Sequence, residues 1–411
     1  MAFSQQAVDY LSAHPKRFNI LHGSVRSGKT TNSLLLAPER FAKAPKGDIV
    51  ISGKTERTAY RNIVRALQQM YGERRVKYTK GMAEGRLGNR TFYVVGANDE
   101  TAEGKVQGLT VAYWLADEAV LNPQTFIKQM QARMSPTGAC ADLTMNPAGP
   151  HHHIKTDIID KADELDAQLW HFLLEHNPNL SPAYVENLKK EYGYGSLFYK
   201  RYILGLWVLA EGAVYPFFDE EKHVIPGPPC KADYYTVAVD YGTGNATAFG
   251  LFGHMLEPLK VFPYVGLRCW LERLYYWDSR KPGNYQKTDA DYARDFGAFV
   301  EGTPLRSIIV DPSAASFKLE LRRSGWSQVI DADNSVVDGI RTQATMLQSG
   351  AYKICEAAEQ AIVDYSAYLW DAKAQARGED KPLKQDDHVM DMTRYNLQTI
   401  YGIDLLPAGA W

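Results

Sequence analysis

The first half of the chain alternates short apolar runs with longer helical stretches. A strand that is buried on both faces reads as a continuous apolar run, and such strands belong to parallel sheets covered by helices. The pattern therefore predicts an α/β unit with a mostly parallel sheet. Strands are expected over 17–23, 48–53, 91–97, 109–119 and 140–147, and helices over 29–39 and 55–71.

The pattern changes over residues 205–230, which are rich in glycine and proline and are typical of a passage between domains. Four apolar runs then follow in close succession and predict consecutive antiparallel strands. These runs are 234–242, 245–253, 258–265 and 269–277, followed by a helix near 288–300, a strand over 306–311 and mostly helices. We predict one domain over 1–210, a linker over 211–230 and a second domain over 231–411.

Length, net charge and cysteine spacing narrow the class of protein. A length of 411 residues suits two or three domains, and a net charge of −2 gives no global sign of a nucleic-acid or membrane partner. Any DNA-binding surface must then be a local patch. The cysteines lack paired spacing, which favours a reducing compartment and argues against a zinc ribbon. No run approaches ~18 apolar residues, so we expect a soluble, intracellular protein without a membrane partner.

The stretch GSVRSGKT follows the first predicted strand and opens the first long helix. It fits the pattern G-x-x-x-x-G-K-[S/T] of a loop whose backbone N–H groups bind phosphates. In such a loop Lys29 reaches the β- and γ-phosphates and Thr30 ligates Mg²⁺. A glycine-rich surface turn would not need Lys-Thr at the start of a helix. The predicted ATP-binding residues are Gly23, Ser24, Val25, Arg26, Ser27, Gly28, Lys29 and Thr30.

The stretch YWLADEA ends a predicted strand in two acidic residues. Downstream of a phosphate loop, this pair is typical of a magnesium-dependent ATPase, although acidic pairs at strand ends are also common on surfaces. Asp117 is expected to hold the metal through water or Thr30. Glu118 is expected to orient or activate the attacking water, which favours hydrolysis over storage of nucleotide.

Three further positions carry open alternatives. Arg26 could reach the γ-phosphate as an arginine finger in cis, or could face solvent. Arg133 could act in trans on a neighbouring subunit, but an exposed helix arginine is the default. Asn146, in TMNP, could sense hydrolysis from a strand edge or form an ordinary Asn-Pro turn. Residues 151–153, three histidines, are interpreted as a loop rather than a metal site.

The second half places acidic residues at strand ends. Asp240 closes TVAVD and Asp311 closes SIIVD. In DDHVMDMTRY, Asp387 and Asp391 share a helix face at i,i+4, and His388 lies three residues before Asp391. Three converging acidic positions suit two divalent ions ~3.5–4 Å apart, and hard oxygen ligands select Mg²⁺ or Mn²⁺ over zinc. Each position alone could be a turn former.

The meander followed by α/β elements, with an aspartate in its first strand, resembles the ribonuclease-H-like nuclease fold. The full order of ATPase, linker and metal nuclease resembles the large terminase subunit of tailed double-stranded DNA phages. This resemblance runs over nearly the whole chain. It rests on the stretches NILHGSVRSGKT, YWLADEA, TMNPAGPHH, HNPNLSPAYVENLKK, YILGLWVLAEGAVY, VAVDYGTGNATA, IIVDPSAASF, DADNSVVDGI, YSAYLWD and DDHVMDMTRY.

The resemblance implies a motor that packages viral DNA with ATP and a metal-dependent endonuclease that cuts it. It implies that Asn146 couples hydrolysis to movement and that Asp240, Asp311 and Asp391 are the nuclease carboxylates. His388 falls in a His-x-x-Asp signature, and which of Asp386, Asp387 and His388 faces the metals stays open. The implied cofactors are ATP with Mg²⁺ or Mn²⁺ and two such ions at the nuclease site.

The same resemblance implies partners and a location. The partners are double-stranded DNA, the portal protein of the procapsid, the small terminase subunit and further copies of the chain in a ring. The location is the cytoplasm of the infected bacterial host, with transient docking on the procapsid.

Two other functions fit parts of the sequence. An ATPase–nuclease of repair or helicase type would need a second motor lobe, which residues 230–411 do not suggest. A nucleotide-binding assembly protein without cleavage activity would explain the ordinary charge but not the spaced acidic sites.

Overall fold

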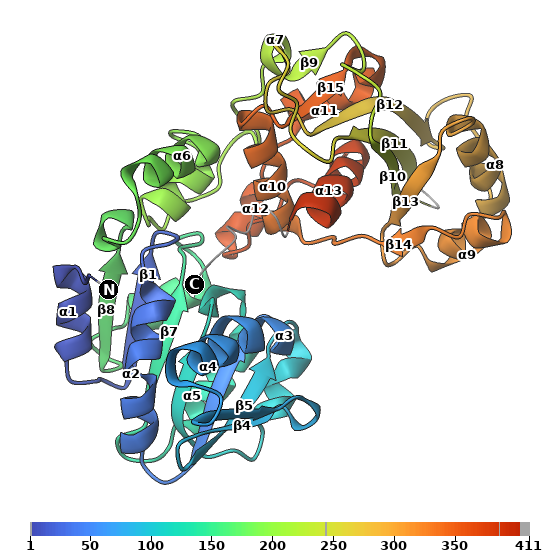
Figure 1. Ribbon diagram of the computed structural model, residues 1–411. Coiled ribbons are helices and arrows are strands. Elements are labelled where there is room, and N and C mark those ends of the chain that lie inside the picture. Colours follow the sequence, from blue (N-terminus) through green and yellow to red (C-terminus); the bar gives the residue numbers. More distant parts are fainter. Residues whose placement is uncertain (1, 243–244, 386, 403–411) are drawn as a thin grey trace.

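The computed structural model describes residues 2–242, 245–385 and 387–402. Two separate β-sheets, each covered by helices, dominate the molecule (Figure 1). The helices are α1 Gln5–Ser12, α2 Lys29–Lys43, α3 Glu56–Ala59, α4 Arg65–Tyr71, α5 Gln124–Arg133, α6 Pro182–Tyr192, α7 Glu220–His223, α8 Asp289–Phe299, α9 Ala315–Arg323, α10 Val336–Gln348, α11 Glu359–Ala367, α12 Ala372–Ala376 and α13 His388–Tyr401. In these described ranges, no helix is both long and apolar enough to cross a membrane.

The first sheet has eight strands in the order β3-β4-β5-β2-β6-β7-β1-β8, and the predicted mostly parallel sheet is confirmed. The six strands from β5 to β8 run parallel, whereas β3 and β4 form an antiparallel edge. The strands are β1 Phe18–Gly23, β2 Asp48–Gly53, β3 Val76–Thr79, β4 Glu84–Leu87, β5 Arg90–Gly96, β6 Val111–Ala116, β7 Cys140–Met145 and β8 Ala167–Phe172.

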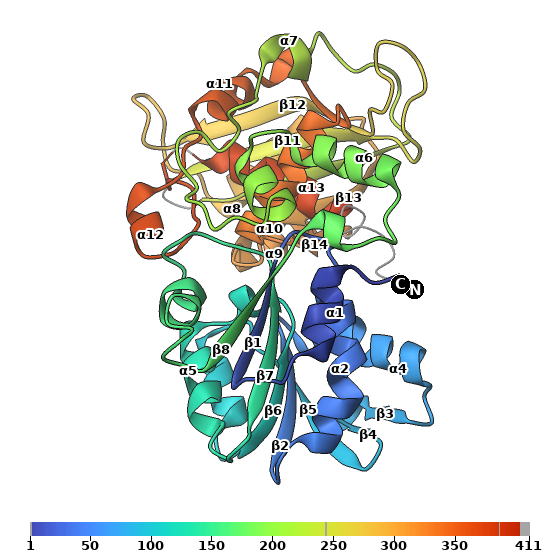
Figure 2. The same ribbon diagram turned by 90° about the vertical axis from the view of Figure 1, so that its left-hand side faces the viewer.

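Both faces of this sheet are buried, which explains the continuous apolar runs. Along β6, Tyr113 and Leu115 pack with α2 and α4, whereas Trp114 and Ala116 pack with α5. Figure 2 shows α1, α2 and α4 on one side of the sheet and α5 on the other. Alternate residues of one strand therefore belong to different cores.

A buried charged cluster fastens α1 and α2 to this sheet. Asp142 in β7 is fully buried, accepts hydrogen bonds from the hydroxyls of Tyr113 (2.7 Å) and Tyr10 (3.2 Å), and lies 3.4 Å from the Arg40 Nε. Burial raises the pKa of Asp142, although Arg40 and the two tyrosines favour its charged form. The cluster is stable only while every charged member keeps its partner.

Replacing Asp142 with alanine is expected to lower the free energy of unfolding by about 3–5 kcal/mol, because it leaves the Arg40 guanidinium buried without its carboxylate. Urea unfolding followed by tryptophan fluorescence measures this. The control is Glu39→Ala, which removes an exposed ion pair with Lys43 on the same helix and should cost less than about 1 kcal/mol. Equal losses in the two variants would contradict the structural role of the cluster.

The second sheet has seven strands in the order β14-β13-β10-β11-β12-β15-β9. Its centre, β10-β11-β12, is antiparallel, and the flanking strands pair in parallel. The helices α10, α11 and α13 cover one face, and α8 and α9 cover the other. The strands are β9 Val224–Ile225, β10 Tyr234–Asp240, β11 Ala246–His254, β12 Cys269–Asp278, β13 Leu305–Val310, β14 Val329–Asp331 and β15 Tyr352–Cys355.

One predicted strand of this unit is wrong. Residues 258–265 form an irregular loop, and the antiparallel meander has three strands instead of four. Pro258 and Pro263 each lack a backbone N–H group, and the Phe262–Pro263 peptide bond is cis. Val261 and Phe262 face solvent, with 69% and 88% of each exposed, whereas Leu259 and Tyr264 are partly buried against the core.

The chain between the sheets is held by contacts at both ends. Val214 and Tyr215 are buried in the core of the second sheet, and β9 pairs with its edge strand β15. Arg201 forms an ion pair with Asp380, with N–O distances of 2.6 and 3.0 Å. A second ion pair, 3.5 Å long, joins Lys54 after β2 to Asp338 of α10. These contacts connect the two sheets directly.

Candidate active sites

The phosphate loop lies between β1 and α2, as predicted. Gly28 caps α2 with a φ of +89° and contributes no side chain, so the first N–H groups of the helix are left for an anion. Gly23 has a φ of +131°, and a Cβ atom there would lie 2.0 Å from the Phe172 carbonyl oxygen. Both glycines are therefore required by backbone geometry.

Lys29 points back under the loop. Its ammonium donates to the Asn146 Oδ1 (3.0 Å), to the Gly23 carbonyl (3.4 Å) and to the Ser24 carbonyl. Burial lowers the pKa of Lys29 to about 7, against the opposing effect of Asp117 and Glu118. Asn146 thus contacts the same amine that the sequence assigns to the phosphates.

Asp117 is buried at the end of β6 and collects three donors. Thr30 Oγ1 donates to it at 3.3 Å, Thr144 Oγ1 at 3.1 Å and Asn62 Nδ2 at 2.9 Å. The predicted pairing of Thr30 with Asp117 is therefore present. An ionised carboxylate beside a hydroxyl suits Mg²⁺, which prefers oxygen ligands.

Glu118 follows with a left-handed backbone, φ +51°. Its surface is exposed, but the surrounding protein desolvates the carboxylate, and Asp117 and Asp338 add negative charge. These effects raise the pKa of Glu118 to about 7, against Arg341 and Lys54. Such a pKa suits a group that exchanges protons near neutral pH.

Residues 202–205 lie directly against the phosphate loop. Val25 N donates to the Tyr202 carbonyl (2.8 Å), and Ser24 Oγ donates to the Ile203 carbonyl (2.5 Å). Gly205 approaches so closely that a Cβ atom there would lie 2.9 Å from the Gly23 Cα. The chain that leads to the second sheet therefore forms one wall of the nucleotide site.

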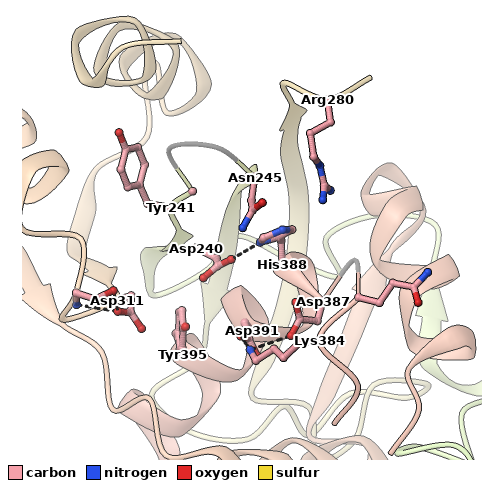
Figure 3. Close-up of a pocket in the computed structure, with 13 residues that line it drawn as sticks. Asp240, Tyr241, Asn245, Arg280, Asp311, Lys384, Asp387, His388, Asp391 and Tyr395 are labelled. Atoms are coloured by element: carbon pink, nitrogen blue, oxygen red, sulfur yellow. Dashed lines mark hydrogen bonds and ion pairs between the residues drawn. The ribbon is translucent and has the colours of Figure 1, made fainter. Parts of the chain in front are cut away.

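A second site lies at one edge of the other sheet, in a pocket of about 440 Å³ (Figure 3). Strands β10 and β13 pair in parallel with Val239 opposite Val310, so Asp240 and Asp311 leave the sheet side by side. Helix α13 adds residues from its first turns. The side chains that line the pocket include Asp240, Asp311, Lys384, Asp387, His388, Asp391 and Tyr395.

Asp240 and His388 face each other in this pocket. The His388 Nδ1 lies 2.7 Å from the Asp240 Oδ2. Burial raises the pKa of Asp240, and the negative charges of Asp391 and Asp387 raise it further. Burial alone would lower the pKa of His388, but the hydrogen bond and charge of Asp240 raise it. The pair is therefore held together by charge as well as geometry.

The remaining carboxylates differ in their partners. Asp311 accepts from Ser313 N (2.7 Å) and Asn334 Nδ2 (3.3 Å), and its pKa is lowered because such hydrogen bonds outweigh the effect of burial. Asp391 lies between Arg394 and Lys384, each 2.7 Å from one of its oxygens. The Asp387 Oδ2 is buried and lacks a hydrogen-bond partner among the described residues.

The comparisons with known proteins cover both halves of the chain. The family described as "Terminase large subunit, T4likevirus-type, N-terminal" matches residues 20–222. The structure of a large terminase from a thermophilic bacteriophage is 37% identical, with a TM-score of 0.89, and the match covers 97% of this chain and 99% of that chain. The chain belongs to the large terminase family. The same phage protein has also been solved with ADP and with ATP-gamma-S, and both structures match at 37% identity and a TM-score of 0.87, over 97% of this chain and 99% of those chains. No curated protein matches this terminase.

The terminase fold brings most of the predicted residues together. Lys29 bonds Asn146, and the next residue, Thr30, bonds Asp117. Arg26 is half-buried with a φ of +56°, and its carbonyl accepts from Asn177 Nδ2. Arg133 ends α5 near Gln131, whose carbonyl accepts from Arg17 just before β1, at the sheet edge opposite the loop. The His152 Nε2 lies 3.1 Å from the Val120 carbonyl oxygen. Asp386 lies outside the described residues.

Sequence reasoning missed several residues of both sites. Asn62 reaches Asp117 from a single π-helical turn, Tyr60–Val64, between α3 and α4. The charges of Asp338 and Arg341, on helix α10 of the second unit, act on the pKa of Glu118. Lys384 lies among the carboxylates of the second site. Asn62 and Lys384 lie outside any motif, so only the folded chain reveals them.

Proposed function

We propose that this large terminase is a DNA-packaging motor in which residues 1–210 bind and hydrolyse ATP. The observation that carries the proposal is the Lys29–Asn146 and Thr30–Asp117 pairing beneath an open helix N-terminus. A relative that is 37% identical over nearly its whole length has been solved with ADP and ATP-gamma-S. The division into 1–210, a connecting segment 211–230 and 231–411 is part of this proposal.

The residues of the first site have distinct roles in this proposal. The loop N–H groups and Lys29 bind the phosphates, and Arg26 supports the γ-phosphate. Thr30 and Asp117 hold Mg²⁺, which neutralises phosphate charge when bound. Glu118 orients and deprotonates the attacking water.

Asn146 carries the state of the nucleotide to the rest of the chain. It shares the Lys29 ammonium with the loop, so a phosphate that draws Lys29 away also changes the partners of Asn146. The proposal links this change to movement of duplex DNA.

We also propose that the second site is a metal-dependent DNA endonuclease of ribonuclease-H-like fold. Asp240, Asp311 and Asp391 would hold two Mg²⁺ or Mn²⁺ ions, and Asp387 and His388 would support them. The donor set fits hard cations, because it offers carboxylate oxygens and a buried Asp387 oxygen without a hydrogen bond. Bound ions would supply an activated water and stabilise the leaving 3′ oxygen.

The described carboxylates of the second site are not arranged around a common point that could hold a metal ion. Within the described ranges, no group of three His, Cys, Asp or Glu side chains is placed to hold one ion. Lys384 pairs with Asp387 and Asp391, Arg394 pairs with Asp391, and His388 pairs with Asp240. Binding of metal ions would therefore require these cations to move away from the carboxylates.

The partners follow from the proposed motor. Double-stranded DNA is the substrate, and the portal protein and the small terminase subunit are the expected docking partners. Several copies of the chain would act in a ring, in the cytoplasm of an infected bacterium.

The proposal as a whole is tested by assaying ATP hydrolysis and plasmid cleavage on one preparation. One variant in each site should abolish the activity of that site and spare the other activity.

The pH dependence of ATP hydrolysis offers a direct check on Glu118. Only its ionised form can accept a proton from water, and its pKa is raised to about 7. We therefore expect kcat/KM to rise with pH toward about 7 as Glu118 ionises, and to fall above it as Lys29, whose pKa is lowered to about 7, loses the proton that it needs to bind phosphate. Asp338→Asn removes a charge that raises this pKa and releases Lys54 and Arg341 from their ion pairs. The rise of kcat/KM should then occur at lower pH. If the rise stays at the same pH, a group other than Glu118 causes it.

A further inference from the structure

Lys384, His388 and Arg394 pair with carboxylates of the second site, and these three cations are held very differently. Arg394 has only 3% of its side chain exposed and also donates to the carbonyls of Asn334 (2.7 Å) and Ser335 (3.2 Å). His388 is fixed on α13 against Asp240. Lys384 comes from the irregular segment before α13, and 66% of its side chain is exposed. Lys384 is thus the cation of the three with the greatest freedom to leave.

The ammonium of Lys384 is shared between two carboxylates. It lies 2.7 Å from the Asp391 Oδ2 and 2.8 Å from the Asp387 Oδ2 (Figure 3). Both contacts are ion pairs, and the contact with Asp391 is also a hydrogen bond. Charge attraction therefore places the ammonium between two oxygens that the α13 backbone already holds close, through the bond from Asp391 N to the Asp387 carbonyl (2.8 Å).

We propose that Lys384 is an internal cation that neutralises Asp387 and Asp391 in the metal-free protein and is displaced when a divalent ion binds there. Lys384 is thus a positioning residue for metal loading. This inference rests on the proposed nuclease function of the site.

The physical argument is one of replacement. Two carboxylates on adjacent helical turns repel each other, and a cation between them removes that repulsion. A divalent ion removes this repulsion more strongly, but it cannot bind the carboxylate oxygens while the Lys384 ammonium contacts them. An exposed lysine on a flexible four-carbon chain forms a weak ion pair that is easily exchanged, whereas the buried bonds of Arg394 are not.

The test measures Mn²⁺ binding by calorimetry without DNA, comparing wild type with Lys384→Met, Lys384→Arg and Lys381→Met. Removing the competing ammonium should tighten Mn²⁺ binding about three- to tenfold. Lys384→Arg keeps the charge and should stay near wild type. Lys381 lies three residues before Lys384 and forms an exposed ion pair with Glu379. Lys381→Met removes that pair and should also bind Mn²⁺ like wild type.

A second measurement uses the unaltered protein. Lys384 should be acetylated about threefold faster with Mn²⁺ than with chelator, as read by mass spectrometry, because the ammonium is released. The rate at Lys381 should not change. Unchanged or weaker Mn²⁺ binding by Lys384→Met, or equal labelling rates at Lys384, would overturn the proposal.

These outcomes separate the two claims. If wild type binds Mn²⁺ and cuts DNA but Lys384→Met binds no more tightly, only the role of Lys384 fails. If wild type neither binds Mn²⁺ nor cuts DNA, the nuclease and the role of Lys384 fail together.

Discussion

Replacing Glu118 with glutamine is expected to reduce ATP hydrolysis by about 10²–10⁴-fold while ATP binding changes little. The amide keeps the size and the hydrogen-bonding reach of the side chain but cannot accept a proton from water. The carboxylate that is lost is the one whose pKa is raised to about 7, beside the buried Asp117. Phosphate release under saturating Mg-ATP measures the rate, and a fluorescent ATP analogue measures binding.

Two control variants make this result specific. Lys29→Ala removes the ammonium beneath the loop and should lose binding as well as hydrolysis. Glu39→Gln changes an exposed glutamate on α2 and should leave both intact. If Glu118→Gln retained a tenth of the wild-type rate, another group would have to activate the water.

Replacing Asp240 with asparagine is expected to reduce plasmid cleavage in Mn²⁺ or Mg²⁺ by at least about 100-fold. The change removes the negative charge at the end of β10 that lies beside Asp311 and faces His388, while the shape of the side chain is kept. ATP hydrolysis should be unchanged, because the two sites are built on different sheets. Agarose gels of supercoiled plasmid, run over a time course, give the rate.

The matched control is Asp331→Asn, an exposed aspartate on β14 of the same sheet that pairs with Lys318. It should cut like wild type. Cleavage by a contaminating nuclease would persist in Asp240→Asn, so the variant also tests the source of the activity. If wild type cuts under neither metal, the second unit is better explained as part of an assembly protein that does not cleave DNA.

The fold was predictable where burial dictates the pattern. Strands β1, β2, β6 and β7 are covered on both faces, and their apolar runs locate them within a few residues. The rule failed at 258–265, where an equally apolar run contains two prolines and lies in solvent. Strand β8 was missed because only one of its six residues is buried, so its sequence lacks a continuous apolar run.

The site residues could likewise be predicted from the sequence only in part. Asp240 and Asp311 were predictable because both end apolar strands, and the parallel pairing of β10 with β13 places them together. Asn62 and Lys384 were not, because Asn62 lies in a local π-helical turn and Lys384 lies in an irregular segment before α13. Side chains that meet only through tertiary structure leave no periodic signal in the chain.

The contact between Gly23 and Gly205 has a consequence for how related sequences can differ. Backbone atoms of the phosphate loop hold residues 202–205, and the chain is buried again in the second core by Val214. An insertion or deletion between these two anchors would shift one of them, so we expect homologues to keep this interval at constant length. The tip of the loop at Val261 and Phe262 is exposed, and natural insertions should accumulate there instead.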